Sequence, residues 1–190
     1  MAKPEIAKDN TYKNIKEDSL VVKFKLNEKK ADEDVYALAW TTTPWTLPSN
    51  LALTVNSNLE YVYLKDKSNG TIYLLAKKLV NNFFKNPQEY EILEEINGRK
   101  LEGKEYEPLF DYFKNNKNSF KFLLGDFVTA DDGTGIVHTA PAFGEDDYAI
   151  CKKYGITMVQ PVDEKGKFTK EVKDFQGQFV HDSNNNIIEF

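Results

Sequence analysis

Three consecutive threonines followed by a proline form the first segment whose residue types could do chemistry. Thr41, Thr42 and Thr43 end an apolar stretch of the sequence. Pro44 then offers no backbone N–H to a sheet, so the chain must turn irregularly at this point. Hydroxyl groups at such a strand end can hydrogen-bond a ligand or a water molecule, and Trp45 can form a wall beside them. Threonine is also a good strand former, and this segment alone favours that simpler explanation.

A second segment, GTGIVHTAPAFGEDDY, places a histidine near a strand end and three acids at the start of a helix. Helical periodicity puts Asp147 on one stripe with Ile150 and Cys151, whereas Asp146 faces water. We therefore expect Asp147 to face inward, toward the strand end that holds His138. A buried carboxylate needs a partner, and the ammonium group of a ligand would be one. Backbone donors or the helix dipole would also serve, and the segment alone favours these.

Several other chemistries find no support in the sequence. It has no phosphate-binding glycine loop, no H-E-x-x-H motif and no G-x-S-x-G motif. One cysteine and two histidines are too few for a structural zinc site, so we expect neither a metal nor a cofactor. The balance of 25 basic against 30 acidic residues gives a net charge of −5, which disfavours strong autonomous nucleic-acid binding.

Length and cysteine usage bound the class of protein. The chain of 190 residues fits one domain, and no apolar run approaches the roughly 18 residues that a membrane helix needs. We therefore expect a chain with no membrane association. A lone cysteine cannot form an internal disulfide, so a cytoplasmic location is expected. Nothing in the sequence argues against a monomer.

The elements that must position the two segments are mainly β-strands. Apolar residues alternate from 20 to 26, and the stretch 35–43 suits a central strand. Asn69 and Gly70 tolerate positive φ and predict a hairpin between their flanking strands. The expected strands span 20–26, 35–43, 51–55, 61–64, 71–75, 90–96, 158–162 and 178–180, with a charged turn at 27–34, a further hairpin formed by 120–129 and 135–139, and helices at 76–85 and 144–154. This pattern predicts a mainly β domain with flanking helices, compatible with a barrel.

Together the two segments resemble the editing domain inserted in isoleucyl-tRNA synthetases. WTTTPWTLPSN and GTGIVHTAPAFGEDDY are similar to the two signature regions of that domain. The stretches LEGKEYEPLFDYF, FLLGDFVT and PVDEKGKFTKEVKDFQGQFV are also similar, and the resemblance runs from about residue 12 to about residue 188. Thr43 stands where valyl and leucyl relatives usually have an arginine, which points to the isoleucyl branch.

The resemblance implies a fold and an activity. The fold would be the closed β-barrel core of the class I aminoacyl-tRNA synthetase editing domain, with flanking helices. The activity would be post-transfer editing, the hydrolysis of the aminoacyl ester of mischarged Val-tRNA(Ile). The HIGH and KMSKS signatures are missing, so no ligase activity is expected. Residues 1–18 would be a leader or junction, 19–182 the editing domain and 183–190 a C-terminal junction to the rest of the synthetase.

The resemblance also implies partners and residue roles. The partners would be the 3′ end of tRNA(Ile) carrying valine, bound weakly by the isolated domain, and the remainder of the synthetase. Thr42 and Asp147 would be catalytic: threonine hydroxyls would hold the ester carbonyl while water attacks, and Asp147 would hold the α-ammonium. His138 would limit the size of the side-chain pocket. The expected substrate-binding residues are Thr41, Thr42, Thr43, Trp45, His138 and Asp147, the threonines and Trp45 also contacting the terminal adenosine.

Two alternatives stay open at the level of sequence. One is a non-catalytic barrel that only binds a small amine or an RNA 3′ end, which composition does not separate from an enzyme. The other is an editing domain of the valyl or leucyl type, which the threonine at position 43 weakens.

Overall fold

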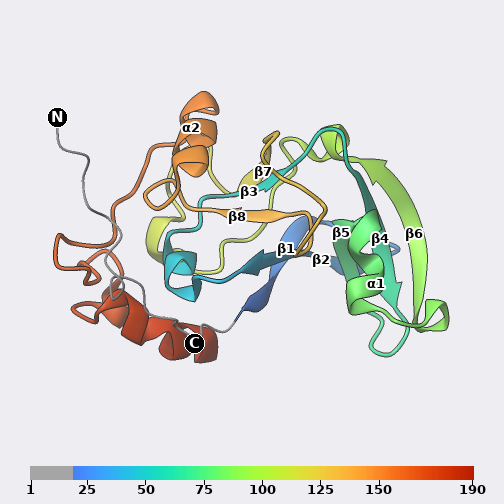
Figure 1. Cartoon of the computed structure of the whole chain (residues 1–190), viewed down its shortest axis with the longest axis horizontal. Helices are drawn as coiled ribbons and strands as arrows, with labels where there is room; N and C mark the ends of the chain where they lie inside the picture. The colour runs from blue at the N-terminus through green and yellow to red at the C-terminus, as the bar shows by residue number, and fades with distance from the viewer. Residues whose placement is uncertain (1–18) are drawn as a thin grey trace, which may run out of the picture.

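The computed structural model describes residues 19–190, and the expected leader at 1–18 lies outside this range. Most of the regular structure is β (Figure 1). The strands are β1 (Leu20–Lys30), β2 (Glu33–Thr41), β3 (Ala52–Val55), β4 (Glu60–Asp66), β5 (Ile72–Ala76), β6 (Tyr90–Asn97), β7 (Lys121–Leu124) and β8 (Val137–Thr139). The α-helices are α1 (Val80–Phe83), α2 (Glu145–Lys153) and α3 (Asn184–Glu189). The 3₁₀ helices are η1 (Pro44–Ser49), η2 (Lys77–Leu79), η3 (Pro87–Glu89), η4 (Gly98–Leu101), η5 (Asp111–Phe113), η6 (Lys173–Phe175) and η7 (Val180–Ser183).

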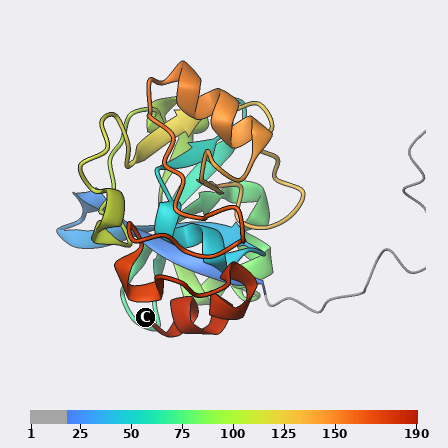
Figure 2. The same cartoon turned by 90° about the vertical axis from the view of Figure 1, so that its left-hand side faces the viewer.

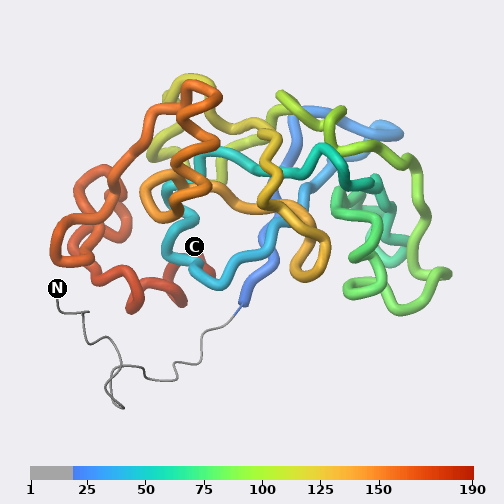
Figure 3. The backbone as a smooth tube through the Cα atoms, turned by 45° about the horizontal axis from the view of Figure 1, so that its top comes forward, coloured from blue at the N-terminus to red at the C-terminus, as the bar shows by residue number. Residues whose placement is uncertain are grey.

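The strands form one mixed sheet. Its order is β6-β4-β5-β2-β8-β3-β7, and β1 pairs with β2 outside this path. Strands β4, β5 and β6 gather at one end of the molecule, and the C-terminal quarter lies at the other (Figure 3). Helices α2 and α3 lie on opposite sides of the strands when the molecule is viewed from the C-terminal end (Figure 2). The expectation of a mainly β fold with few helices is confirmed.

The named strands form an open half-barrel and not the closed barrel that the resemblance implies. A segment without a regular strand, 103–107, lies between β7 and β1. The N–H of Phe122 in β7 donates to the Lys104 carbonyl at 2.9 Å, and the N–H of Asn27 in β1 donates to the Glu105 carbonyl at 3.0 Å. Isolated bridges thus join β7 to β1, and full closure of the barrel remains a proposal.

Several expected elements are present with shifted ends. The hairpin around Asn69 and Gly70 forms from antiparallel β4 and β5, with Gly70 at a φ of 77°. The expected turn at 27–34 shrinks to Ala31 and Asp32, whose φ values are 48° and 66°. Charged residues that indicated a loop instead extend the β1–β2 ladder as an exposed hairpin, which ion pairs between its strands support. The helix expected at 144–154 is α2, whereas that at 76–85 is reduced to η2 and α1.

Two strand expectations are wrong. The stretches 120–129 and 135–139 do not pair with each other, because β3 lies between β7 and β8 and pairs with both. Turn residues indicate that a chain reverses, but they do not identify the neighbour of each strand, and a buried strand from elsewhere in the sequence takes that place. The expected strands at 158–162 and 178–180 are only the isolated bridges Val162–Phe168 and Lys167–Phe179. Pro161 lacks the N–H that a longer ladder would need.

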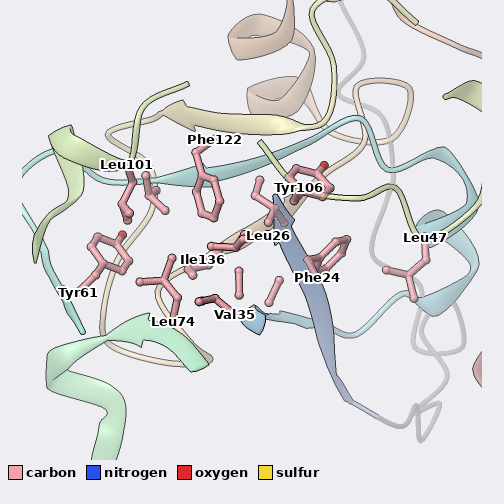
Figure 4. Packing of buried hydrophobic residues seen from close by; sticks show 14 of the residues in the cluster. Phe24, Leu26, Val35, Leu47, Tyr61, Leu74, Leu101, Tyr106, Phe122 and Ile136 are labelled. Carbon is pink, nitrogen blue, oxygen red and sulfur yellow. The ribbon is translucent and has the colours of Figure 1, made fainter. Parts of the chain in front are cut away.

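The main core lies between the strands of the half-barrel (Figure 4). Phe24, Leu26, Tyr106 and Phe122 meet there, each at most 2% exposed. Tyr106 comes from the segment that joins β7 to β1, so the core also covers the inner side of that junction. No helix within 19–190 is both long enough and apolar enough to cross a membrane.

Candidate functional site

The threonine segment forms a tight loop at the end of β2. Thr41 ends the strand, and its Oγ1 accepts a hydrogen bond of 3.1 Å from the backbone N–H of Thr43. The hydroxyl of Thr46 donates to the Thr43 carbonyl at 2.8 Å, which closes the first turn of η1. Thr42 is exposed, and its hydroxyl makes no hydrogen bond with any of the described residues. The loop therefore presents one unengaged hydroxyl on a backbone that the neighbouring threonines fix.

This loop forms one wall of a cavity of about 310 Å³. That volume is at the lower end of the range found for small-molecule sites. The structure brings all six expected substrate-binding residues to this cavity. Its lining consists of Trp40, Thr41, Thr42, Thr43, Trp45, Thr46, Val137, His138, Ala140, Phe143 and Asp147.

His138 lies in β8, and both of its ring nitrogens are already engaged. Its Nδ1 is 2.8 Å from Nδ2 of Asn50, and its Nε2 is 2.9 Å from Oγ1 of Thr46. The side chain is 8% exposed, and burial lowers the pKa of His138 to about 4. The imidazole is therefore neutral at neutral pH. Contacts at both nitrogens hold the ring of His138 in one place at the border of the cavity.

Asp147 faces the same cavity from the first turn of α2. It is partly buried whereas Asp146 is exposed, as helical periodicity predicts. Its Oδ2 accepts a hydrogen bond of 2.9 Å from the backbone N–H of Ala140. Burial raises the pKa of Asp147, the Ala140 N–H opposes this, and the nearby charge of Asp146 adds to it. None of the ion pairs found within 19–190 involves Asp147, so its carboxylate has a backbone donor but no cation.

Trp45 adds an aromatic ring to the lining of the cavity. Its ring lies edge-on to Phe143, with centroids 4.7 Å apart, and 5.7 Å from the ring of His181. Its backbone N–H donates to Oδ1 of Asn184 at 3.0 Å. The indole Nε1 is buried without a hydrogen-bond partner in the described part of the chain. The cavity thus combines an aromatic wall, threonine hydroxyls and a carboxylate.

The sequence did not single out four residues that shape this site. Thr46, Phe143 and Asn50 lie within or beside the two signature segments, and Tyr106 lies in a third similar stretch. A usable signal was the run of polar residues at 49–50 between apolar neighbours, because a buried polar side chain must have a hydrogen-bond partner.

Over 19–190, no three His, Cys, Asp or Glu side chains are grouped so that they could hold a metal ion.

Solved structures define the class of this fold. The chain superposes on the crystal structure of GlLeuRS-CP1 with a TM-score of 0.69 at 18% identity, covering 90% of this chain and 94% of that one. The Plasmodium knowlesi cytosolic leucyl-tRNA synthetase editing domain gives a TM-score of 0.64 at 13% identity, covering 90% of this chain and 92% of that one. The fold is therefore that of the CP1 editing domain of an aminoacyl-tRNA synthetase.

Sequence comparison finds relatives of the chain, although no family model matches it. The isoleucine–tRNA ligase of Clostridium tetani is 47% identical over 179 residues, which cover 94% of this chain and 17% of the relative. That of Corynebacterium diphtheriae is 45% identical over 202 residues, covering 99% of this chain and 19% of the relative. The chain is a homologue of a segment of the isoleucine–tRNA ligases, as the resemblance predicted, and it spans less than a fifth of the length of these relatives.

Proposed function

We propose that this chain is an editing deacylase that hydrolyses the ester between valine and the 3′ end of tRNA(Ile). The observation that supports this most is the pairing of two groups on one cavity. Among the described residues, the partly buried carboxylate of Asp147 has no cation and the hydroxyl of Thr42 has no hydrogen-bond partner. An aminoacyl ester has an ammonium group and a carbonyl group that match these two. Homology to isoleucine–tRNA ligases also supports this function.

Positioning is the core of the proposed mechanism. Asp147 holds the α-ammonium of the valyl group, and a carboxylate paired with an ammonium is a poor base, so its role is to orient the substrate. The hydroxyl of Thr42 donates to the ester carbonyl oxygen. A water molecule attacks the carbonyl carbon, the ester C–O bond breaks, and the ribose oxygen takes up a proton. The products are valine and free tRNA, and fixing the reacting groups supplies the acceleration.

Substrate choice in this proposal depends on size. A hydrophobic synthetic site rejects an amino acid one methylene too small only weakly, and isoleucine against valine is the standard example. A second site that admits valine and sterically excludes isoleucine corrects the error. His138 is suited to limit the pocket, because hydrogen bonds on both ring nitrogens hold the ring in one place.

The setting of the domain is also part of the proposal. Its partners are the 3′ end of tRNA(Ile) and the remainder of a cytoplasmic isoleucine–tRNA ligase, with the domain at 19–182 flanked by junctions at 1–18 and 183–190. Because the net charge is −5, the isolated chain holds tRNA weakly and the rest of the ligase provides most of the affinity. In isolation we expect a monomer in which segment 103–107 closes the barrel.

Deacylation of two charged tRNAs tests this function. The chain is mixed at high concentration with Val-tRNA(Ile) or Ile-tRNA(Ile), and release of the labelled amino acid is followed against spontaneous hydrolysis. We expect release of valine to exceed that of isoleucine by at least about tenfold, the factor that a difference of about 1.4 kcal/mol provides. Binding without any accelerated release would instead indicate a non-catalytic binder. Preferential clearance of mischarged tRNA(Val) or tRNA(Leu) would indicate an editing domain of the valyl or leucyl type.

A further inference from the structure

We propose that Tyr106, which does not line the cavity, is a positioning residue that fixes the tautomer and orientation of His138 through Asn50. The inference deepens the proposed function, since it concerns the histidine that limits the editing pocket. It nevertheless stands on contacts within the chain and can be tested without any substrate.

The hydroxyl of Tyr106 has a fixed place in the core. The residue is 1% exposed, and its ring packs edge-to-face against Phe24, Phe120 and Phe122 at centroid distances of 5.5, 6.1 and 6.4 Å. From there the hydroxyl donates a hydrogen bond of 2.6 Å to Oδ1 of Asn50. The tyrosine belongs to the segment that joins β7 to β1, and Figure 4 shows its ring among the core side chains.

Asn50 passes this constraint on because its amide has only one satisfactory orientation. The Nδ2 group is 2.9 Å from the carbonyl oxygen of Ala52 and 2.8 Å from Nδ1 of His138. A carbonyl oxygen accepts only, so the amide nitrogen must face Ala52. In this orientation Oδ1 accepts the hydrogen bond from the hydroxyl of Tyr106. Both ends of the amide therefore have partners within the chain, and Asn50 is 5% exposed.

The orientation of Asn50 decides the protonation of His138. Since Nδ2 of Asn50 donates, Nδ1 of His138 must be the accepting nitrogen and Nε2 must have the proton. Nε2–H then donates to Oγ1 of Thr46, whose own hydroxyl donates to the carbonyl of Thr43 in the threonine loop. One directed series of hydrogen bonds thus runs from the core tyrosine through the amide and the imidazole to the loop that lines the cavity.

Removing the tyrosine hydroxyl removes the first hydrogen bond of this series. In Tyr106→Phe, Oδ1 of Asn50 becomes a buried acceptor without a donor. Turning the amide over would set its oxygen against the Ala52 carbonyl, so the side chain is then held by its nitrogen alone. Without a partner at Oδ1, Asn50 can move away from Nδ1 of His138, and a ring nitrogen that no longer accepts this hydrogen bond can take the proton as the Nδ1–H tautomer. That tautomer leaves Nε2 without a proton to donate to Thr46, and the ring loses its fixed place at the cavity wall.

The decisive experiment is ¹⁵N NMR of the histidine ring, with the His138 signals assigned by comparison with His138→Gln. In the unaltered chain we expect a single Nε2–H tautomer. In Tyr106→Phe we expect a mixture of tautomers, together with a several-fold loss of the preference for Val-tRNA(Ile) over Ile-tRNA(Ile). Tyr63→Phe is the matched control: Tyr63 is 0% exposed, but its hydroxyl donates to Glu28 and not to Asn50. We expect this control to leave the tautomer and the preference unchanged.

A second variant tests the same link in case Tyr106→Phe does not fold. Asn50→Asp replaces the donating amide by an acceptor, so we expect it to convert His138 to the Nδ1–H tautomer or to the imidazolium. A folded Tyr106→Phe or Asn50→Asp that keeps the pure Nε2–H tautomer would overturn the inference. The two proposals fail separately. A tautomer change without any deacylation refutes the proposed function only, whereas deacylation with an unchanged tautomer refutes the role of Tyr106 only.

Discussion

The backbone N–H of Trp45 donates a hydrogen bond of 3.0 Å to Oδ1 of Asn184, which is 139 residues further along the chain. Asn184 begins α3, and Ile187 on the same helix is 5% exposed against the core cluster. The C-terminal segment expected to be a junction therefore also supports the aromatic wall of the cavity.

Asn184→Ala tests this support. Loss of the acceptor leaves the Trp45 N–H unsatisfied, so we expect the free energy of unfolding to fall by about 1 kcal/mol. We also expect deacylation of Val-tRNA(Ile) to slow several-fold. Asn185→Ala is the control, because Asn185 is exposed on the same helix. Denaturant unfolding and deacylation of both variants would be compared, and equal effects of the two substitutions would contradict the link.

Asp147→Asn tests the ammonium-binding role. The amide keeps an oxygen for the Ala140 N–H but has no charge, so stability should change little while KM for Val-tRNA(Ile) rises by about tenfold or more. Asp146→Asn removes the adjacent exposed charge and should change KM far less. Steady-state deacylation kinetics measure both effects. An unchanged KM in Asp147→Asn would rule out the ammonium contact.

Thr42 and Thr46 should respond differently to loss of a hydroxyl. Thr42→Val removes a group without a partner among the described residues, so we expect unfolding free energy to change by less than about 0.5 kcal/mol while deacylation slows. Thr46→Val leaves Nε2–H of His138 without its acceptor, so we expect a loss of about 1–3 kcal/mol of stability. Denaturant titrations and deacylation rates separate the two roles. Equal destabilisation by both substitutions would show that Thr42 also has a structural partner.

The low pKa of His138 predicts a specific dependence of stability on pH. In the unfolded chain the imidazole binds a proton below about pH 6.5, whereas in the folded chain its pKa is about 4. Stability from neutral His138 is therefore present above pH 6.5 and lost as the pH falls toward 4. Between pH 7 and pH 5 we expect its loss to be about 2 kcal/mol.

His138→Gln isolates this contribution. Asp147 faces the same cavity, and its raised pKa acts in the opposite direction, but it is common to both proteins and cancels in their difference. The free energy of unfolding of both proteins would be measured by urea denaturation at pH 7 and pH 5. A parallel pH dependence in the two would contradict a neutral His138.

Local patterns in the sequence predicted the elements that depend on neighbours in the chain. The inward side of α2, with Asp147 partly buried and Cys151 at 1% exposure, follows from helical period alone. The hairpin at Asn69 and Gly70 follows from turn chemistry. The place of β3 between β7 and β8 does not, because strand order depends on long-range pairing that no local pattern encodes.

The candidate site divides in the same way. Residues with obvious chemistry, such as the threonines and His138, could be selected from the sequence, and all line one cavity. Asn50 and Tyr106 could not be linked to them, since their partners are 88 and 56 residues away and come together only when the sheet forms. A buried amide and a core tyrosine have no distinguishing pattern of their own.

A structure of the chain with a non-hydrolysable valyl-adenosine analogue tests the proposed editing site most directly. We expect the analogue in the cavity lined by Thr42, His138 and Asp147, with its ammonium about 3 Å from the Asp147 carboxylate and its carbonyl oxygen within hydrogen-bond distance of Thr42. An analogue bound with its ammonium toward solvent and away from Asp147, or bound outside this cavity, would contradict the proposed editing site.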